Sequence, residues 1–195
     1  MTHEGAPLLI DAVMPEPDAA VAAHVIVRKE PSATYRAAIE LDFLSVSTPL
    51  LDAAMWARGV PERLGRRPSV PPARLVLSQG DPLPGWLVLG EQEDHELVFG
   101  AIGKFWQPAI EWRDVARDQF EAFREPGWGK IAAAFVVTPY GQASSLLTYE
   151  CRTATTDPAS RRRFLRYWRL VRPFVAHILR ATVHTIREHA EHGDG

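Results

Sequence analysis

Two charged residues that lie two positions apart, Glu150 and Arg152, are the first candidates for chemistry in this sequence. They fall in the segment 144–156, SSLLTYECRTATT, which we predict to be a β-strand. Side chains at i and i+2 of a strand point to the same face, so the carboxylate and the guanidinium share one side of the sheet. If this face lines a cavity, the pair can orient the polar end of a ligand or act as an acid/base couple. An internal or surface ion pair is the structural alternative.

Aromatic side chains form the second group of candidates. Six tryptophans occur, at positions 56, 86, 106, 112, 128 and 168. Trp106 and Trp112 flank the loop QPAIE, where we expect the mouth of a pocket, and large rings suit ligand stacking and cavity lining. Core packing is the alternative for each tryptophan, and Trp168 is expected in the core because it lies on the apolar seam of a C-terminal helix.

Metal and nucleophile patterns give weaker signals. His184, Glu188 and His192 have i, i+4, i+8 spacing, but they lie in a polar C-terminus and are expected to be solvated, so we predict no metal site. Cys151 has no neighbouring histidine in the sequence and is expected to be an inert buried thiol. The sequence has no HExxH, paired CxxC, GxSxG, GxGxxG or Walker pattern, and we predict no cofactor.

A band of arginines lies at the start of the C-terminal helix, at positions 161, 162, 163, 166, 169 and 172. Such a band can attract phosphate or nucleic acid. No interleaved aromatic residues and no nucleic-acid-binding module accompany it. We therefore expect a solvated face with surface ion pairs, and no nucleic-acid partner.

The composition is that of an ordinary globular domain. The chain has 195 residues, of which 46% are hydrophobic and 24% charged, with a net charge of −2. Prolines mark residues 1–20 as an N-terminal arm, and 21–192 are expected to form a single domain. The single cysteine favours a cytoplasmic location, and the N-terminus lacks signal-peptide character. No apolar run approaches the ~20 residues of a membrane span, so no membrane insertion is expected. The excess of arginine over lysine indicates GC-rich coding, typical of a bacterial source.

The elements that position these residues are a series of strands followed by one long helix. We expect strands at 22–29, 73–79, 86–91, 96–106, 129–141 and 144–156, and helices at 31–40, 48–59 and 158–190. Gly100 and Gly103 predict a bulge or bend within their strand. Asp157 is expected to cap the last helix, and Pro173 to kink it.

Several segments give the chain a family resemblance. They are AHVIVRKEPSATYRAAIELDF, TPLLDAAMWARGVPERL, LVFGAIGKFW, AAFVVTPYG, LLTYECRTATTD and RRFLRYWRLVRPFVAHILR, and the match spans roughly residues 8–190. In these segments the chain resembles the SRPBCC superfamily of START-like, Bet v 1-like and polyketide cyclase-like helix-grip proteins, and within it an uncharacterised bacterial subgroup. The resemblance implies an α+β helix-grip fold. A seven-stranded curved antiparallel sheet would wrap the C-terminal helix, and two short helices would follow the first strand.

A sheet that wraps around a helix tends to enclose a cavity, which suggests that the chain binds a small hydrophobic or amphipathic molecule. An enzyme of the polyketide cyclase or dehydratase kind, using the same cavity, is the alternative. A structural role, with a homodimer formed through an exposed strand or helix, is also left open. The predicted ligand-binding residues are Met55, Trp56, Phe99, Lys104, Trp106, Phe135, Tyr149, Glu150 and Arg152.

Overall fold

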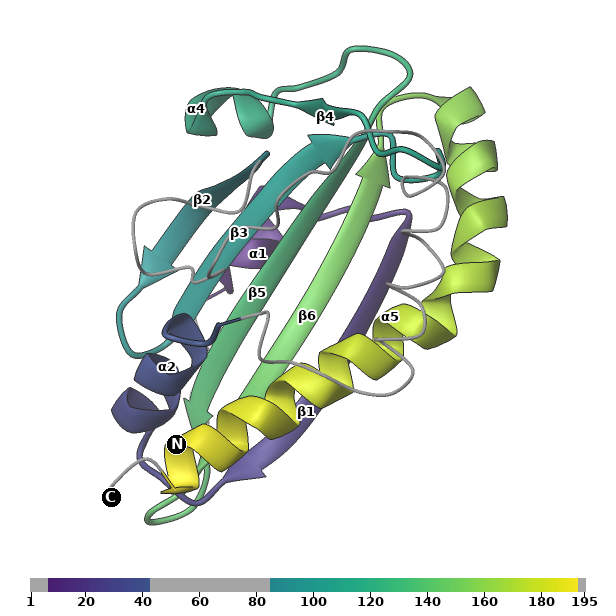
Figure 1. The fold of residues 1–195 in the computed structure, drawn as a ribbon. Helices are drawn as coiled ribbons and strands as arrows, with labels where there is room; N and C mark the ends of the chain where they lie inside the picture. The colour runs from purple at the N-terminus through teal and green to yellow at the C-terminus, as the bar shows by residue number, and fades with distance from the viewer. Residues whose placement is uncertain (1–6, 43–84, 193–195) are drawn as a thin grey trace, which may run out of the picture.

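The computed structural model describes residues 7–42 and 85–192. Within these ranges, strands and short helices precede one long C-terminal helix (Figure 1). In chain order the elements are α1 (Leu9–Val13), β1 (Ala19–Val27), α2 (Pro31–Ile39), β2 (Trp86–Gln92), β3 (Glu96–Gly103), β4 (Trp112–Arg113), α4 (Arg117–Phe120), β5 (Gly129–Pro139), β6 (Ser145–Thr155) and α5 (Pro158–His192).

The strands of the described ranges form one six-stranded antiparallel sheet. Its order is β1-β6-β5-β3-β2, and β4 pairs with the end of β3. The hairpin of β5 and β6, with 11 residues in each strand, lies in the middle of this sheet. Its register runs from Gly129 opposite Thr155 to Pro139 opposite Ser145 without a shift. A curved antiparallel sheet with a long C-terminal helix across it is the helix-grip architecture that the sequence predicts.

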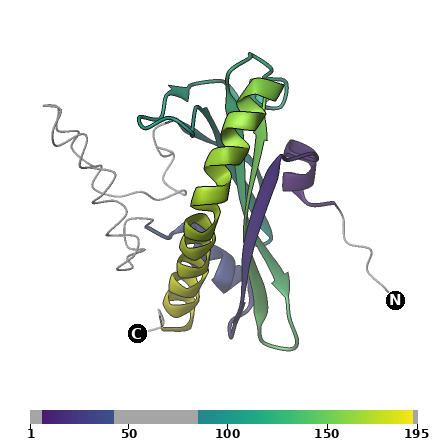
Figure 2. The same cartoon turned by 90° about the vertical axis from the view of Figure 1, so that its right-hand side faces the viewer.

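The two faces of the sheet carry separate apolar layers, because side chains alternate along each strand. One face carries Phe99, Phe135 and Tyr149 and packs against α5 and α2; we call it the helix face. The other carries Val98 and Ala134 and packs against α1; we call it the outer face. Figure 2 shows α5 and α1 on opposite sides of the sheet.

The helix α5 is fixed at its first turn and bends in its middle. Asp157 accepts hydrogen bonds from the backbone amides of Ala159 and Ser160, at 2.8 and 3.0 Å, and from the Ser160 hydroxyl at 2.6 Å. The Ser160 hydroxyl, followed by the backbone amides of Gly127 and Ser160, holds the pKa of the Asp157 carboxyl well below its usual range. The predicted N-cap is therefore confirmed. Pro173 lies inside α5, and the helix changes direction near its middle (Figure 1), as expected where proline removes a backbone hydrogen bond.

Several expectations differ in detail from the structure. The described residues hold six strands rather than seven, and the predicted helix 48–59 and strand 73–79 lie outside these ranges. The irregularity expected in β3 lies on β2 instead, where the register shifts between Val88 and Gly90. Gly100 serves close packing, because a Cβ there would lie 2.5 Å from the carbonyl oxygen of Ile131. None of the described helices has the length and apolar character of a membrane span.

Candidate functional site

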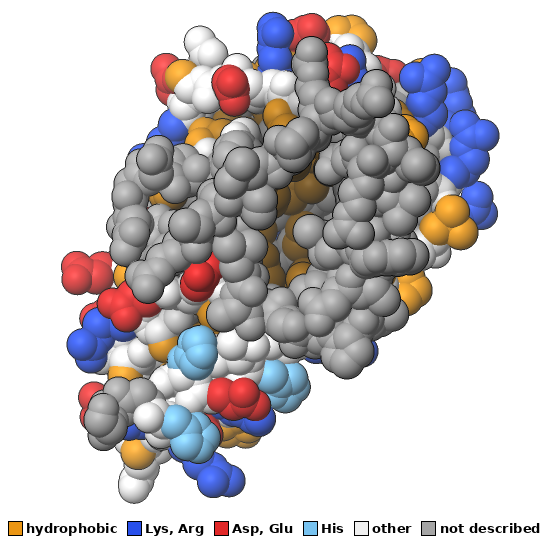
Figure 3. Space-filling model, in the orientation of Figure 1, with side chains coloured by type: hydrophobic (Ala, Val, Ile, Leu, Met, Phe, Trp, Pro, Cys, Tyr) orange, Lys and Arg blue, Asp and Glu red, His pale blue; other side chains and the backbone are white. Residues whose placement is uncertain are grey.

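The helix face carries a continuous row of aromatic rings. The ring of Tyr149 on β6 lies 4.5 Å from that of Phe135 on β5 and 6.4 Å from that of Phe99 on β3, measured between centroids. Trp86 on β2 extends the row, with its ring 5.6 Å from Phe99 and 6.3 Å from Trp112. Figure 3 shows hydrophobic side chains set deep in the face that α5 crosses. The row therefore brings together three of the predicted site residues: Phe99 from β3, Phe135 from β5 and Tyr149 from β6.

Tyr149 is the polar group within this aromatic row. The residue is 8% exposed, and its hydroxyl has no hydrogen-bond partner among the residues that the structure describes. Burial raises the pKa of this hydroxyl far above its ordinary value, so it stays protonated at neutral pH. A buried hydroxyl normally has a partner, since leaving it without one costs about 1–3 kcal/mol. No described residue occupies the Tyr149 hydroxyl, which can therefore donate a hydrogen bond to a molecule bound on the helix face, or accept one from it.

Cys151 lies two residues further along β6 and packs against the same apolar cluster. Burial, with a smaller contribution from the negative charge of Glu150, raises the pKa of its thiol to about 12. At neutral pH the thiol is therefore protonated and weakly nucleophilic. This agrees with the expectation of an inert thiol.

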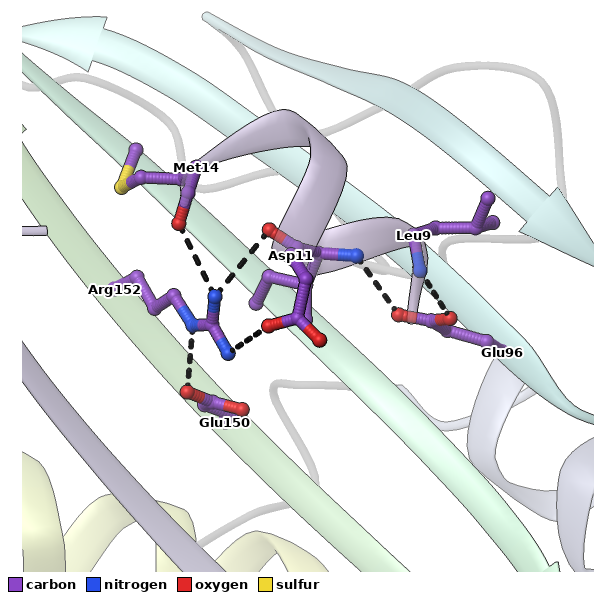
Figure 4. A network of polar contacts seen from close by, with 7 residues as sticks. Leu9, Asp11, Met14, Glu96, Glu150 and Arg152 are labelled. Atoms are coloured by element: carbon purple, nitrogen blue, oxygen red, sulfur yellow. Dashed lines mark hydrogen bonds and ion pairs between the residues drawn. The ribbon is translucent and has the colours of Figure 1, made fainter. Parts of the chain in front are cut away.

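Glu150 and Arg152 lie on the outer face, on the opposite side of the sheet from Tyr149. Arg152 Nε donates to Glu150 Oε1 at 2.7 Å, and its Nη2 pairs with Asp11 Oδ1 of α1 at 2.7 Å. Its Nη1 donates to the carbonyl oxygen of Met14 at 3.1 Å, as Figure 4 shows. The structure places this pair on the side of the sheet that faces α1 rather than on the side that faces α5, because strand alternation turns both side chains toward α1. The structural alternative, an ion pair that organises the fold, describes them.

Glu96 completes the attachment of α1, a role that no motif in the sequence indicates. Its side chain is fully buried, and its two carboxylate oxygens accept hydrogen bonds from the amides of Leu9, at 2.7 Å, and Ile10, at 3.0 Å (Figure 4). These amides belong to the first turn of α1 and have no partner within a helix. Glu96 therefore holds the start of α1, while Arg152 holds its end. Hydrogen bonds that join segments 86 residues apart leave no local pattern in the sequence.

The remaining predicted site residues are placed differently. Lys104, after β3, pairs with Glu111 at 2.8 Å and lies 4.3 Å from the ring of Trp128, which belongs to the outer-face cluster. Trp106 is half-buried near the start of β5, where its ring would be 3.2 Å from a Cβ at Gly129. Met55 and Trp56 lie outside the described residues.

Trp168 and Trp86 are placed differently from the sequence-based expectation. Trp168 is half-buried rather than in the core, and its ring lies 5.8 Å from that of Phe164. Trp86 was predicted only as one of six tryptophans, yet it joins the aromatic row. The alternation of Trp86 and Val88 on β2, both packed against the helix-face cluster, is the signal that could have placed it there.

The metal-binding residue types and the arginine band were the remaining candidates for a site. Within residues 7–42 and 85–192, no group of three or more His, Cys, Asp or Glu side chains is placed to hold a metal ion. In the arginine band, Arg161 pairs with Asp18 at 2.8 Å. The other predicted arginines of the band are exposed.

Comparison with known proteins finds no matching family model and no matching curated protein. Solved structures do match over most of the chain. One is a hypothetical protein from Helicobacter pylori, with 13% identity over 97% of this chain and 98% of that chain and a TM-score of 0.43. Another is a Thermus thermophilus protein, with 11% identity, coverage of 91% and 100%, and a TM-score of 0.36. A third is a Streptomyces aromatase/cyclase, with 13% identity, coverage of 91% and 98%, and a TM-score of 0.30. Likenesses of this strength carry no conclusion about a ligand or an activity.

Proposed function

We propose that this chain binds a small hydrophobic or amphipathic molecule against the helix face of its sheet, with the Tyr149 hydroxyl as the polar contact. The observation that carries the proposal is Tyr149, a residue buried in a row of aromatic rings whose hydroxyl has no hydrogen-bond partner among the described residues. Ligand sites in proteins typically combine apolar and aromatic walls with a few polar groups that fix orientation. The row of Trp86, Phe99, Phe135 and Tyr149 has this composition.

A cyclase or dehydratase that acts at the same place is the alternative, and it would need an acid or base at the ligand. Of the residues considered for that role, Glu150 and Arg152 lie on the outer face and Lys104 lies beside Trp128. Tyr149 is on the helix face, but burial raises the pKa of its hydroxyl, which makes it a poor base at neutral pH. These placements favour binding over proton transfer by the predicted residues.

The proposal is tested with two probes that differ by one hydroxyl, naphthalene and naphthol. Both are to be titrated against the wild-type protein and Tyr149→Phe, with tryptophan fluorescence as the readout. We expect the wild type to bind naphthol more tightly than naphthalene. In Tyr149→Phe this preference should fall by about 2- to 10-fold, as expected for the loss of one hydrogen bond.

Naphthalene serves as the internal control, because its affinity depends on the aromatic wall and not on the hydroxyl. It should bind both proteins within about twofold. If neither probe binds the wild type, or if the preference for naphthol is the same in both proteins, the proposed site is not at Tyr149. Native mass spectrometry of protein purified from its own host would then identify any natural ligand.

A further inference from the structure

A cavity of about 350 Å³ lies on the outer face, on the opposite side of the sheet from Tyr149. Its walls come from the end of α1, the segment after α4, the start of β5 and the end of β6. Met14, Phe123 and Ala154 supply apolar surface, and Arg124 and Lys130 supply positive charge. Ligand binding on the helix face, as proposed above, gives this cavity no role.

Lys130 is the unusual residue of this cavity. The residue is 8% exposed, although lysine is rarely buried without a partner. Its Nζ donates to the carbonyl oxygens of Phe120, at 3.4 Å, and Glu121, at 3.1 Å. The same nitrogen lies 5.5 Å from the centroid of the Phe120 ring. Among the described residues, no carboxylate forms an ion pair with it.

Burial makes the neutral amine more accessible at Lys130 than at an ordinary lysine. A neutral amine has two N–H groups, which the two carbonyl oxygens accept, and one lone pair that remains available. An ammonium ion has a third N–H group, for which the described residues offer no acceptor. Burial is the main cause that lowers the pKa of Lys130 to about 8, followed by the charge of Arg124, while Glu121 acts in the opposite direction. Glu16 and Glu121 are the acidic residues that line the cavity.

We propose that Lys130 is a nucleophilic amine that captures a small aldehyde or ketone in this cavity as a Schiff base. The lone pair of Nζ attacks the carbonyl carbon to give a carbinolamine. Loss of water then forms the C=N bond, and the carbonyl oxygen leaves with the two hydrogen atoms of the amine. No oxidant or reductant is consumed, and the reverse reaction with water releases the carbonyl compound. Lysines that are desolvated and lie near another cation are known to be activated in this way.

The chain has only two other lysines, Lys29 and Lys104, so the test can compare all three in one sample. The wild-type protein is to be treated with propanal and cyanoborohydride at pH 8, and the adduct on each lysine measured by peptide mass spectrometry. About half of an amine with a pKa of 8 is neutral at that pH, compared with about 0.3% of an ordinary lysine. We expect the initial rate of adduct formation at Lys130 to exceed that at Lys29 and Lys104 by at least about tenfold. The N-terminal amine is scored separately, because it titrates near pH 8 in any chain.

An equal or slower rate at Lys130 than at Lys29 would overturn the proposal. Two controls test whether the cavity is responsible. In urea, where the cavity is lost, the three lysines should react at similar rates. Ala12→Trp places a large ring at the cavity wall on an exposed position of α1, and should slow Lys130 severalfold without changing Lys104. An unchanged rate at Lys130 in this variant would show that the reaction does not occur in the cavity. None of these outcomes depends on ligand binding at Tyr149.

Discussion

Two buried tyrosines, Tyr35 and Tyr149, differ in a single hydrogen bond. Tyr35 is 2% exposed, and its hydroxyl donates to the carboxylate of Glu91 at 2.7 Å. Tyr149 is 8% exposed, and within the described residues its hydroxyl has no such acceptor. Burial raises the pKa of both hydroxyls, so both are protonated near neutral pH. The hydroxyl of Tyr35 contributes a hydrogen bond to stability, whereas that of Tyr149 contributes none with the described residues.

This difference predicts that the same substitution affects stability differently at the two positions. Tyr35→Phe should lower the free energy of unfolding by about 1–2 kcal/mol, because it removes the hydrogen bond between the hydroxyl of the buried Tyr35 and a carboxylate. Tyr149→Phe should leave stability unchanged within about 0.5 kcal/mol, or raise it. Urea unfolding followed by tryptophan fluorescence measures both. A loss of more than about 1 kcal/mol in Tyr149→Phe would mean that the hydroxyl has a structural partner.

Lys130 predicts a pH dependence of stability. Its pKa is lowered to about 8 in the folded chain from 10.5, so the unfolded chain binds more protons between these two values. The free energy of unfolding therefore rises with pH across this window, and the contribution of Lys130 is least favourable below pH 8. From pH 7 to pH 10, the free energy of unfolding of the wild type should therefore rise by about 2 kcal/mol relative to that of Lys130→Met, which lacks the titrating amine.

Urea unfolding of both proteins at several pH values measures this difference. Taking the difference removes the contributions of Tyr35, Tyr149 and Cys151, whose raised pKa values make stability fall as pH rises through the ordinary values of these groups. A difference that stays constant from pH 7 to pH 10 would show that the Lys130 amine titrates normally in the folded protein.

At the scale of the elements, α1 depends on side chains from the sheet rather than on its own sequence. It has only five residues and no side-chain cap of its own. Isolated helices of this length are not stable in water. Glu96 and Arg152 supply acceptors and donors at its two ends, and Ile10 is fully buried against the outer face.

Glu96→Ala should therefore detach α1. The substitution leaves the amides of Leu9 and Ile10 without acceptors in a buried place, which should lower the free energy of unfolding by about 2–4 kcal/mol. Limited proteolysis should cut between α1 and β1 faster than in the wild type. Glu111→Ala is the control, since its ion pair with Lys104 is exposed and contributes at most about 1 kcal/mol. Equal stability and equal proteolysis of the two variants would refute the attachment of α1 by Glu96.

Much of the element order could be predicted because it depends on local signals. The capped start of α5 at Asp157 and the hairpin of β5 and β6 were predicted within a few residues of their bounds. The helical turn of α1 could not be predicted, because prolines surround it and its partners are distant in sequence. The bulge was expected near Gly100 but lies on β2, since Gly100 serves close packing against Ile131 and Leu89.

The aromatic residues of the candidate site could be predicted from the sequence, but the face of the sheet on which each residue lies could not. Phe99, Phe135 and Tyr149 do come together, as expected for apolar and aromatic residues on neighbouring strands. Strand alternation shows that Tyr149 and Glu150 cannot share a face, but the sequence alone does not tell which face meets α5. Both faces of this sheet are apolar and covered, one by α5 and α2 and the other by α1. The usual contrast between a core face and a solvent face is therefore missing in the middle strands.

At the scale of the whole molecule, the sheet separates two candidate sites. The aromatic row and Tyr149 lie on the helix face, and the cavity with Lys130 lies on the outer face. A ligand bound on one face meets different side chains from a ligand bound on the other, although the strands are the same. Substitutions of neighbouring residues on one strand can therefore separate the two sites.

Ala133 and Ala134 on β5 make this separation possible. Ala133 is 1% exposed and lies on the helix face between Phe99 and Cys151, while Ala134 is 0% exposed and lies on the outer face between Val98 and Glu150. Adding two methyl groups at either position overpacks the sheet to a similar extent, at a cost of about 1–3 kcal/mol.

The most direct measurement is the affinity of anilinonaphthalene sulfonate, a fluorescent apolar dye, for the wild type, Ala133→Val and Ala134→Val under conditions where all three are folded. If the ligand site is on the helix face, Ala133→Val should bind the dye at least about fivefold more weakly than the wild type, and Ala134→Val should match the wild type within about twofold. Equal affinities for the two variants, or weaker binding in Ala134→Val alone, would contradict a ligand site on the helix face.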